Sequence, residues 1–380
     1  MLYLSLLLLS AIALAAPLET RQLGELLTTM MSEISPNKTV ELPTTMKREG
    51  AKRVRIYYGP FEILGAEAAK KAPMLRMDPG STTWAKIANG LPVDSTILKT
   101  NTSLQLLDGT PADIGAGIYN HHVVMIDQSK SSPVVTTCTN ATTFQKAITP
   151  KTIPMTIFAG TSEDDSSMLF SNADGTFNSG FWLPKTDKVI LMGEIINYRN
   201  TSTFVYSVTD IEYVPGKSAG MLDGYTTVLD VAICGGTDAW KMLLPHTATE
   251  KKFKAVSQPM TVMQDGWLIH KGGHLHDGGD VIIMTINGNV VCESKARYGG
   301  GSQVLKGEDG KAWETLSSMG ECNEPIKLKK GDQVVVEARY DFEAHPARKH
   351  AVEDGGMAEV MGLFSTNFAP DPDGTGGKFS

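Results

Sequence analysis

The sequence predicts an all-β protein made of two antiparallel β-sandwiches with a short N-terminal helical arm. Short runs rich in β-branched and aromatic residues recur at fairly regular spacing, separated by Gly, Asn, Asp and Pro, with few helical stretches between them. The chain has 380 residues, more than one hydrophobic core usually serves. We therefore expect two domains.

Residues 1–16 are typical of a secretory signal peptide. A short apolar run ends in the small-residue pattern Ala13-Leu14-Ala15, which suits signal peptidase. This run is too short to span a bilayer, and no later stretch is long and apolar enough to do so. The tail at 369–380 carries no hydrophobic anchor signal, and we expect it to be flexible. The prediction is a secreted, extracellular protein without a membrane span.

Residues 17–50 form the predicted N-terminal arm. Leu23, Leu26, Leu27 and Met30 follow helical spacing, and polar residues continue to position 50. The strand-like runs then follow in order: VRIYYGPF, GIYNHHVVMID, KVILMGEIINY, STFVYSVTDIEYV, TTVLDVAI, GWLIHKGGHLH, DVIIMTING, DQVVVEARYDF and EVMGLFSTNF. The segment VPGKSAGM marks the joint, so we expect a first sandwich at 51–216 and a second at 217–368.

The cysteines indicate an oxidising compartment. Four are present, an even number in an exported chain, which predicts two disulfides with three possible pairings. We favour Cys292–Cys322, because these two bracket one glycine-rich excursion, and by elimination Cys138–Cys234. Four glycosylation sequons point the same way: Asn37, Asn101, Asn140 and Asn200.

The net charge of -7 argues against a nucleic-acid partner. There is no basic run and no basic amphipathic helix to offset that judgement. The sequence leaves the oligomeric state open.

The histidines carry the main chemical signal. Only eight are present, and four of them form two compact groups, His121-His122 and His274-x-His276. Residues i and i+2 of a strand share a face, so His274 and His276 can offer two imidazoles to one metal ion. Neighbouring residues project to opposite faces, so His121 and His122 converge only where the strand twists, bulges or frays.

Methionine separates the candidate metals. A thioether is a soft ligand that suits Cu(I), whereas zinc favours imidazole, thiolate and carboxylate. Met357 and Met361 lie four residues apart in GGMAEVMGLF, so both would face the same side of a strand. His270 shares the expected strand face of His274 and could orient an imidazole from behind. His246 is the other histidine between the two groups, and it is a further candidate to bind the metal or to support one of its ligands.

A family resemblance covers roughly residues 54–368. The stretch GWLIHKGGHLHDGGDVIIMTINGNVVCESKARYGGG, then Cys322, KLKKGDQVVVEARYDF and VMGLFSTNF, resembles the C-terminal half of the stress-up-regulated nodulin family. That family is similar to the copper type II, ascorbate-dependent monooxygenases, exemplified by peptidylglycine α-hydroxylating monooxygenase and dopamine β-monooxygenase. The upstream YNHHVVMID resembles the double-histidine strand of both groups.

The resemblance implies two tandem jelly-roll-like domains that face each other across a solvent-filled cleft, each with one copper. It matches His274, His276 and Met361 to the site that handles dioxygen, and His121 and His122 to two ligands of the electron-transfer site. Met361 is preferred over Met357 because VMGLF aligns best. The expected activity is an oxidase or hydroxylase that uses dioxygen and a diffusing reductant such as ascorbate on a small-molecule or peptide substrate.

The sequence departs from the monooxygenase pattern at the third histidine of the electron-transfer site. Ile195 or Ile196 stands where that histidine should be. We therefore expect one copper site in the second domain and a weak or absent one in the first. A non-catalytic copper-binding or copper-handling protein is the alternative. A minor alternative is a cupin-like metal protein, because His274-x-His276, Asp280 and Gly288 imitate a cupin motif.

Overall fold

The prediction of an all-β sandwich fold is confirmed by the structure, a computed structural model. It describes residues 31–380 except 73–79, 140–151, 154, 164–166, 233, 235–242, 245–249, 300–304, 307–311, 349–359, 375 and 378–380. The predicted signal peptide and the predicted helix at 23–30 lie outside the described residues. Among those described, no helix is long and apolar enough to cross a membrane.

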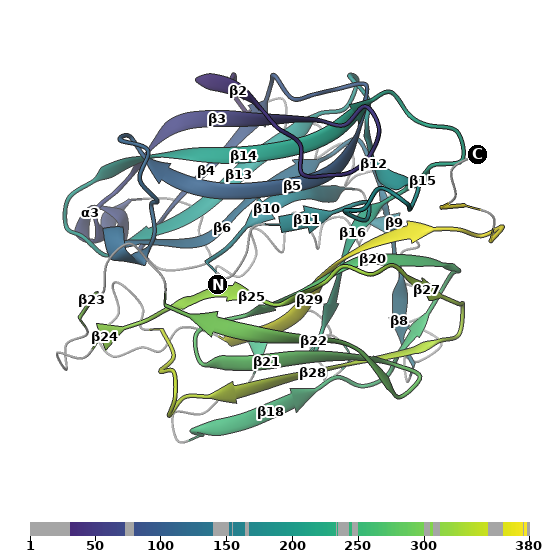
Figure 1. Cartoon of the computed structure of the whole chain (residues 1–380). Helices are drawn as coiled ribbons and strands as arrows, with labels where there is room; N and C mark the ends of the chain where they lie inside the picture. The colour runs from purple at the N-terminus through teal and green to yellow at the C-terminus, as the bar shows by residue number, and fades with distance from the viewer. Residues whose placement is uncertain are drawn as a thin grey trace.

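Two sheets form the first half of the molecule, which is the upper half in Figure 1. The first sheet has the order β1 (Glu33–Ile34), β4 (Ser81–Ala88), β13 (Val189–Asn197), β6 (Ile118–Asp127) and β10 (Thr156–Thr161). The second has the order β15 (Leu222–Asp223), β12 (Ser179–Leu183), β5 (Ser95–Leu106), β14 (Thr203–Pro215), β3 (Lys52–Ile63) and β2 (Lys38–Leu42), with β11 (Ser167–Leu169) on β5. Helix α3 (Ala66–Lys71) and the 3-10 turn η1 (Ile114–Ala116) interrupt the strands.

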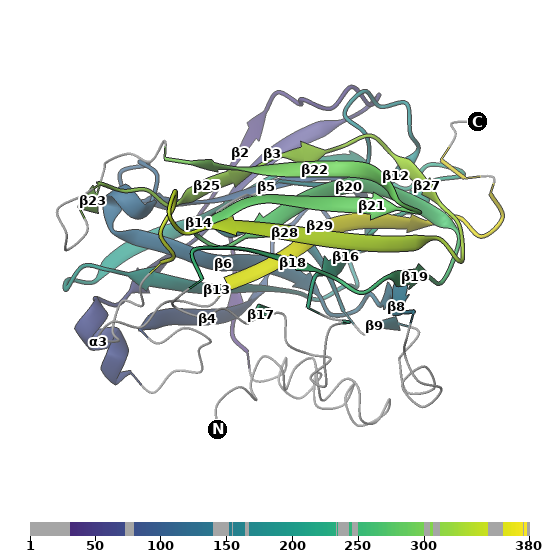
Figure 2. The same cartoon turned by 90° about the horizontal axis from the view of Figure 1, so that it is seen from below.

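Two further sheets form the second half. The inner one has the order β16 (Tyr225–Asp230), β29 (Val360–Pro370), β20 (Gly266–Leu275) and β26 (Glu321–Cys322), with β17 (Leu243–Leu244) on β29 and β27 (Ile326–Leu328) on β20. The outer one has the order β25 (Leu316–Met319), β22 (Asn289–Tyr298), β21 (Gly279–Ile286), β28 (Gln333–Asp341), β19 (Met260–Val262) and β8 (Thr136–Cys138), with β18 (Lys252–Val256) on β28. Seen from below, β18, β28, β21 and β22 cover this half (Figure 2). Two small ladders complete the set: β7 (Ser132–Pro133) with β9 (Thr152–Ile153), and β23 (Leu305–Lys306) with β24 (Ala312–Trp313).

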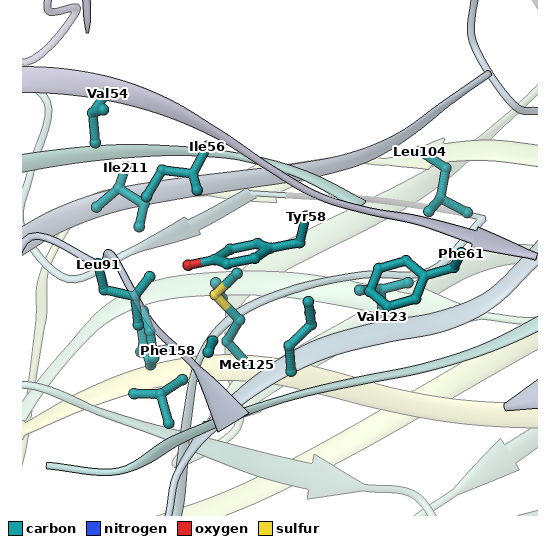
Figure 3. Close-up of a cluster of buried hydrophobic side chains, with 14 of the residues drawn as sticks. Val54, Ile56, Tyr58, Phe61, Leu91, Leu104, Val123, Met125, Phe158 and Ile211 are labelled. Atoms are coloured by element: carbon teal, nitrogen blue, oxygen red, sulfur yellow. The ribbon is translucent and has the colours of Figure 1, made fainter. Parts of the chain in front are cut away.

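A separate hydrophobic core fills each half. In the first, Val123 and Met125 of β6 pack with Tyr58 and Phe61 of β3, as Figure 3 shows. The Tyr58 hydroxyl lies inside this core and donates to the backbone oxygen of Asn89 at 2.6 Å, which satisfies a buried polar group. This packing fixes the strand that carries the first histidine pair.

The two halves pack directly against each other. Strand β10 contacts β16, and β11 contacts β20. The Asn367 side-chain amide donates to the backbone oxygen of Leu169 at 2.6 Å, and the rings of Phe177 and Trp267 meet edge to face with centroids 5.1 Å apart. Because one face of β20 covers the second core and the other meets the first half, nearly all of this strand is buried.

Part of the expected N-terminal arm is built into the first half. Strand β2 pairs antiparallel with β3 at the edge of its sheet. The buried Glu212 carboxylate then accepts hydrogen bonds from the backbone N–H groups of Thr45 and Met46, at 2.6 and 3.0 Å. The polar composition predicted a peripheral arm. A strand with polar side chains can nevertheless pair through its backbone with the edge of a sheet whose outer face is in water.

Segment 132–138 crosses from the first half to the second. Strand β8 pairs with β19 of the outer sheet, and Val135 packs in the second core. Both expected disulfides are present, Cys138–Cys234 and Cys292–Cys322. The first of them holds β8 in place. The division of the chain into domains at residue 216 stays a prediction.

We predict that removing the Cys138–Cys234 disulfide destabilises the protein. The bridge closes a loop of 96 residues, so the double variant Cys138→Ser/Cys234→Ser should lose about 2–5 kcal/mol of unfolding free energy through a larger entropy of the unfolded chain. Urea denaturation measures this. Cys292→Ser/Cys322→Ser, with a separation of 30 residues, is the matched comparison and should lose less. An unchanged midpoint in the first variant would contradict the prediction.

Candidate metal centre

A β-bulge brings the two adjacent histidines to one carboxylate. On β6, His122 pairs with Glu194 of β13, whereas Asn120 pairs with the next residue, Ile195, so His121 is the extra residue of a bulge. Glu194 Oε2 lies 3.8 Å from His121 Nδ1 and 3.9 Å from His122 Nε2. A bulge is one of the strand irregularities that allow the side chains of two adjacent residues to converge.

The three groups fit a metal ion. One donor atom from each of His121, His122 and Glu194 lies within 4.8 Å of the other two. Two atoms bound to the same ion at about 2.0–2.1 Å lie at most about 4.2 Å apart, so only small movements separate this arrangement from ligation. Glu194 thus offers a third donor group beside the two histidines.

Glu194 was not predicted from the sequence, because the resembled family has a histidine as the third ligand of this site. Its side chain is only 1% exposed, and Ser81 donates a hydrogen bond to its other oxygen, Oε1, at 2.7 Å. A single charged residue inside the apolar run VILMGEIIN is the signal that could have identified it.

The second histidine pair lies at the end of β20 and just after it. His274 pairs with Leu363 of β29, and Leu275 pairs with Gly362. The rings of His274 and His276 are 5.3 Å apart between centroids, as expected for side chains that share a strand face. Gly278, at φ +96°, turns the chain directly afterwards, and a Cβ there would meet the Phe342 ring at 2.3 Å.

Met361 lies on the face of β29 that corresponds to these histidines. Since Leu363 is opposite His274 in the ladder, Met361, two residues before it, shares the His274 face. The Tyr340 hydroxyl donates to the Met361 backbone oxygen and so holds this end of β29. The assignment of Met361 as a sulfur ligand stays a prediction, and Met357 and His246 lie outside the described residues.

The side chain of His270 lies away from the two histidine pairs and contacts Asn323. Its Nδ1 lies 2.7 Å from Asn323 Oδ1, and burial lowers its pKa. It does not line the cavity described below, and it contacts Asn323 rather than an imidazole of either pair.

Three of these four histidines, His121, His274 and His276, line one small cavity between the halves. The rings of His121 and His276 are 6.3 Å apart between centroids. The cavity has a volume of about 10 Å³, comparable with the space for one water molecule. Its lining is Tyr119, His121, Ser162, Glu163, His274, Leu275, His276, Asp277 and Leu316. The expected solvent-filled cleft between the two histidine groups is therefore wrong, because the halves pack together at this point.

Two further carboxylates at this cavity were also missed. Glu163 accepts a hydrogen bond from the Asn120 backbone N–H at 3.1 Å and lies 3.2 Å from the Thr315 hydroxyl, so it contacts both halves. Asp277 accepts one from the Leu316 backbone N–H at 2.8 Å. The local sequence around Glu163 and Asp277 does not predict that they lie at the same cavity, because this depends on contacts between residues far apart in the chain.

Burial sets the protonation of the centre. Together with a smaller effect of the neighbouring His121, it lowers the pKa of His122 to about 4, against the opposing effect of Glu194. His122 is therefore neutral at pH 7, the form that binds metal. Burial raises the pKa of Glu163 to about 8, with a smaller contribution from the Asp277 charge. In the metal-free protein Glu163 thus holds a proton at neutral pH.

Two fungal proteins are similar to most of this chain. One is probable copper-dependent oxygenase M1 of Phoma sp., 22% identical over 341 residues, which are 89% of this chain and 78% of that protein. The other is probable copper-dependent oxygenase clz3 of Cochliobolus lunatus, 23% identical over 263 residues, 69% of this chain and 76% of that protein. This chain is copper oxygenase-like. No family model matches it, and its resemblance to the nodulin family stays a prediction.

Solved structures add only weak likenesses. PNGF-II has 11% identity and a TM-score of 0.37 over 88% of this chain and 65% of its own. PNGase F from Flavobacterium meningosepticum has 11% identity and a TM-score of 0.35 over 84% of this chain and 96% of its own. Such TM-scores do not establish a shared fold.

We predict that Glu194 contributes to metal affinity. The substitution Glu194→Gln removes the charge and one strong donor and should lower copper affinity by roughly 10- to 100-fold, measured by competition with a chelator. Glu212→Gln is the matched control, because Glu212 is another buried carboxylate of the same half that contacts Thr45 and Met46 instead. Equal affinity in Glu194→Gln and the native protein would show that this carboxylate is not a ligand.

Proposed function

We propose that this protein is a secreted copper-binding protein with oxygenase-like chemistry, centred on His121, His122, His274 and His276. The observation that carries the proposal is the close approach of these four side chains, half of all histidines in the chain. His121, His274 and His276 line one cavity, and the ring of His122 lies beside that of His121. The similarity to probable copper-dependent oxygenases supports copper as the metal.

The donor set fits copper better than the other common metals. Neutral imidazoles bind copper in both oxidation states, and a thioether at Met361 would favour Cu(I). Calcium and magnesium prefer oxygen ligands, and a zinc site gains little from a thioether. Bound copper would supply one-electron chemistry toward dioxygen, with electrons from a diffusing reductant such as ascorbate.

Residues of the first half contact the histidines and line the cavity. Ser162 Oγ lies 3.4 Å from His274 Nδ1 and contacts this ring from the first half. The Glu163 carboxyl holds a proton beside the cavity, between the Asn120 N–H and the Thr315 hydroxyl. A proton held there is available to a reduced oxygen species, which is the role we assign to Glu163.

Secretion belongs to the same proposal. Two disulfides fit an oxidising compartment. Of the four sequons, Asn37 and Asn200 are exposed and Asn101 is half-buried, whereas Asn140 lies outside the described residues. Exposed acceptors are accessible to the glycosylation machinery.

A copper-handling protein without turnover is the second candidate. The small size of the cavity favours it, because about 10 Å³ is comparable with the space for a single ion or water molecule. The cupin-like alternative has less support, since Asp280 is exposed on β21 and does not line the cavity beside His274 and His276.

We predict that His276→Ala removes copper from the purified protein, because one of two imidazoles from the same strand end is lost. Met361→Leu should retain Cu(II) and weaken Cu(I) by roughly tenfold, because the side chain keeps its size and loses its soft donor. Elemental analysis and Cu(I) competition measure the two effects. Zinc or iron occupancy that neither substitution changes would contradict the copper assignment.

Turnover separates the two candidate functions. With ascorbate and oxygen, the copper-loaded oxygenase should form hydrogen peroxide or a hydroxylated product well above the rate of the metal-free protein. Oxygen consumption measures this, and His276→Ala serves as the inactive comparison. Tight copper binding without oxygen consumption would favour copper handling.

A further inference from the structure

His276 lies just beyond the end of its strand. The last pair in the ladder between β20 and β29 joins Leu275 and Gly362, so this ladder ends one residue before His276. Two glycines, Gly278 and Gly279, follow closely, and glycine has more backbone freedom than any other residue type. A metal ligand at this place therefore needs another support to keep its imidazole in one position.

The hydroxyl of Tyr298 contacts this turn. Tyr298 is the last residue of β22, and its Oη accepts a hydrogen bond from the Gly278 N–H and donates one to the Gly279 backbone oxygen, both at 2.8 Å. The Gly279 N–H in turn donates to the His276 backbone oxygen at 3.0 Å. One hydroxyl thus ties both glycines to a strand of the outer sheet.

Residues from the end of β28 onward hold Tyr298 and the turn as well. The His345 ring is parallel to the Tyr298 ring, with centroids 3.5 Å apart and an angle of 1° between the planes. The Asp341 N–H donates to the Gly278 backbone oxygen at 2.8 Å, and the Phe342 ring occupies the space that a Cβ at residue 278 would need. The ring stack restricts the phenol, so its hydroxyl stays directed at the turn.

We propose that Tyr298 is a positioning residue for His276, and that His345 keeps the Tyr298 ring in place. Neither Tyr298 nor His345 lines the cavity, so both act through the turn and not on the metal. This role rests on the proposed function, in which His276 binds copper. Groups that orient a metal ligand typically contribute a factor of about 10–100 to metal affinity.

Tyr298→Phe in the full-length protein tests the positioning role. The ring can stay stacked on His345 and only the hydroxyl is lost, so the variant should bind as much copper at saturation as the native protein. Its affinity, measured by competition with a chelator, should fall roughly 10- to 100-fold. The hyperfine coupling in its Cu(II) electron paramagnetic resonance spectrum should change, because the His276 imidazole is held less firmly. Native affinity together with a native spectrum would overturn the positioning role.

Tyr58→Phe is the matched control. It also removes a hydroxyl that donates to a backbone oxygen, that of Asn89, but in the first core and not at the cavity. Thermal unfolding of the metal-free proteins should show a loss of stability, whereas copper affinity and spectrum should stay native. If Tyr58→Phe lowered the affinity as much as Tyr298→Phe, general destabilisation would explain both effects, and the positioning role would be wrong.

Variants of His345 separate support from metal ligation. His345→Phe keeps a ring on Tyr298 and should retain native copper affinity. His345→Ala removes the stack and should weaken copper binding in the same direction as Tyr298→Phe. Loss of copper from His345→Phe would make this imidazole a ligand and overturn its supporting role.

The native protein separates the positioning role from the proposed function. Copper bound by the native protein, with equal affinity and spectrum in Tyr298→Phe, would overturn the positioning role and leave the proposed function intact. No copper bound by the folded native protein would overturn both.

Discussion

The direct packing of the inner sheet of the second half against the first half determines the rest of this structure. One face of β20 belongs to the second core, and its other face carries His274 toward the first half. A gap at this interface would separate the histidine pairs into two solvated sites. Close packing instead produces one small cavity lined by three imidazoles and two carboxylates, where electrostatic interactions are stronger than in water.

Some of the site could be predicted from local sequence. The strand period of two is sufficient to place His274 and His276 on the same face. The two cysteine pairs follow from their positions around a glycine-rich segment and from elimination. These features depend on residues close in sequence, or on covalent pairing with few alternatives.

The rest depends on long-range contacts. The bulge at His121 is a property of hydrogen-bond register between β6 and β13, and no residue type in YNHHVVMID specifies it. Glu163 and Asp277 become neighbours only when the two halves meet. The polar residues after position 35 suggested a peripheral segment. Their pairing as β2 with the edge strand β3 depends on the folded sheet and cannot be predicted from composition.

The crossing of segment 132–138 limits how far the molecule can be treated as modular. This segment precedes much of the first half in the chain, yet β8 closes an edge of the outer sheet of the second half, and Val135 fills part of its core. A C-terminal fragment produced alone from residue 217 would therefore expose an open strand edge and an apolar gap, both of which promote aggregation. Circular permutation that keeps 132–138 attached would be the better route to an isolated half.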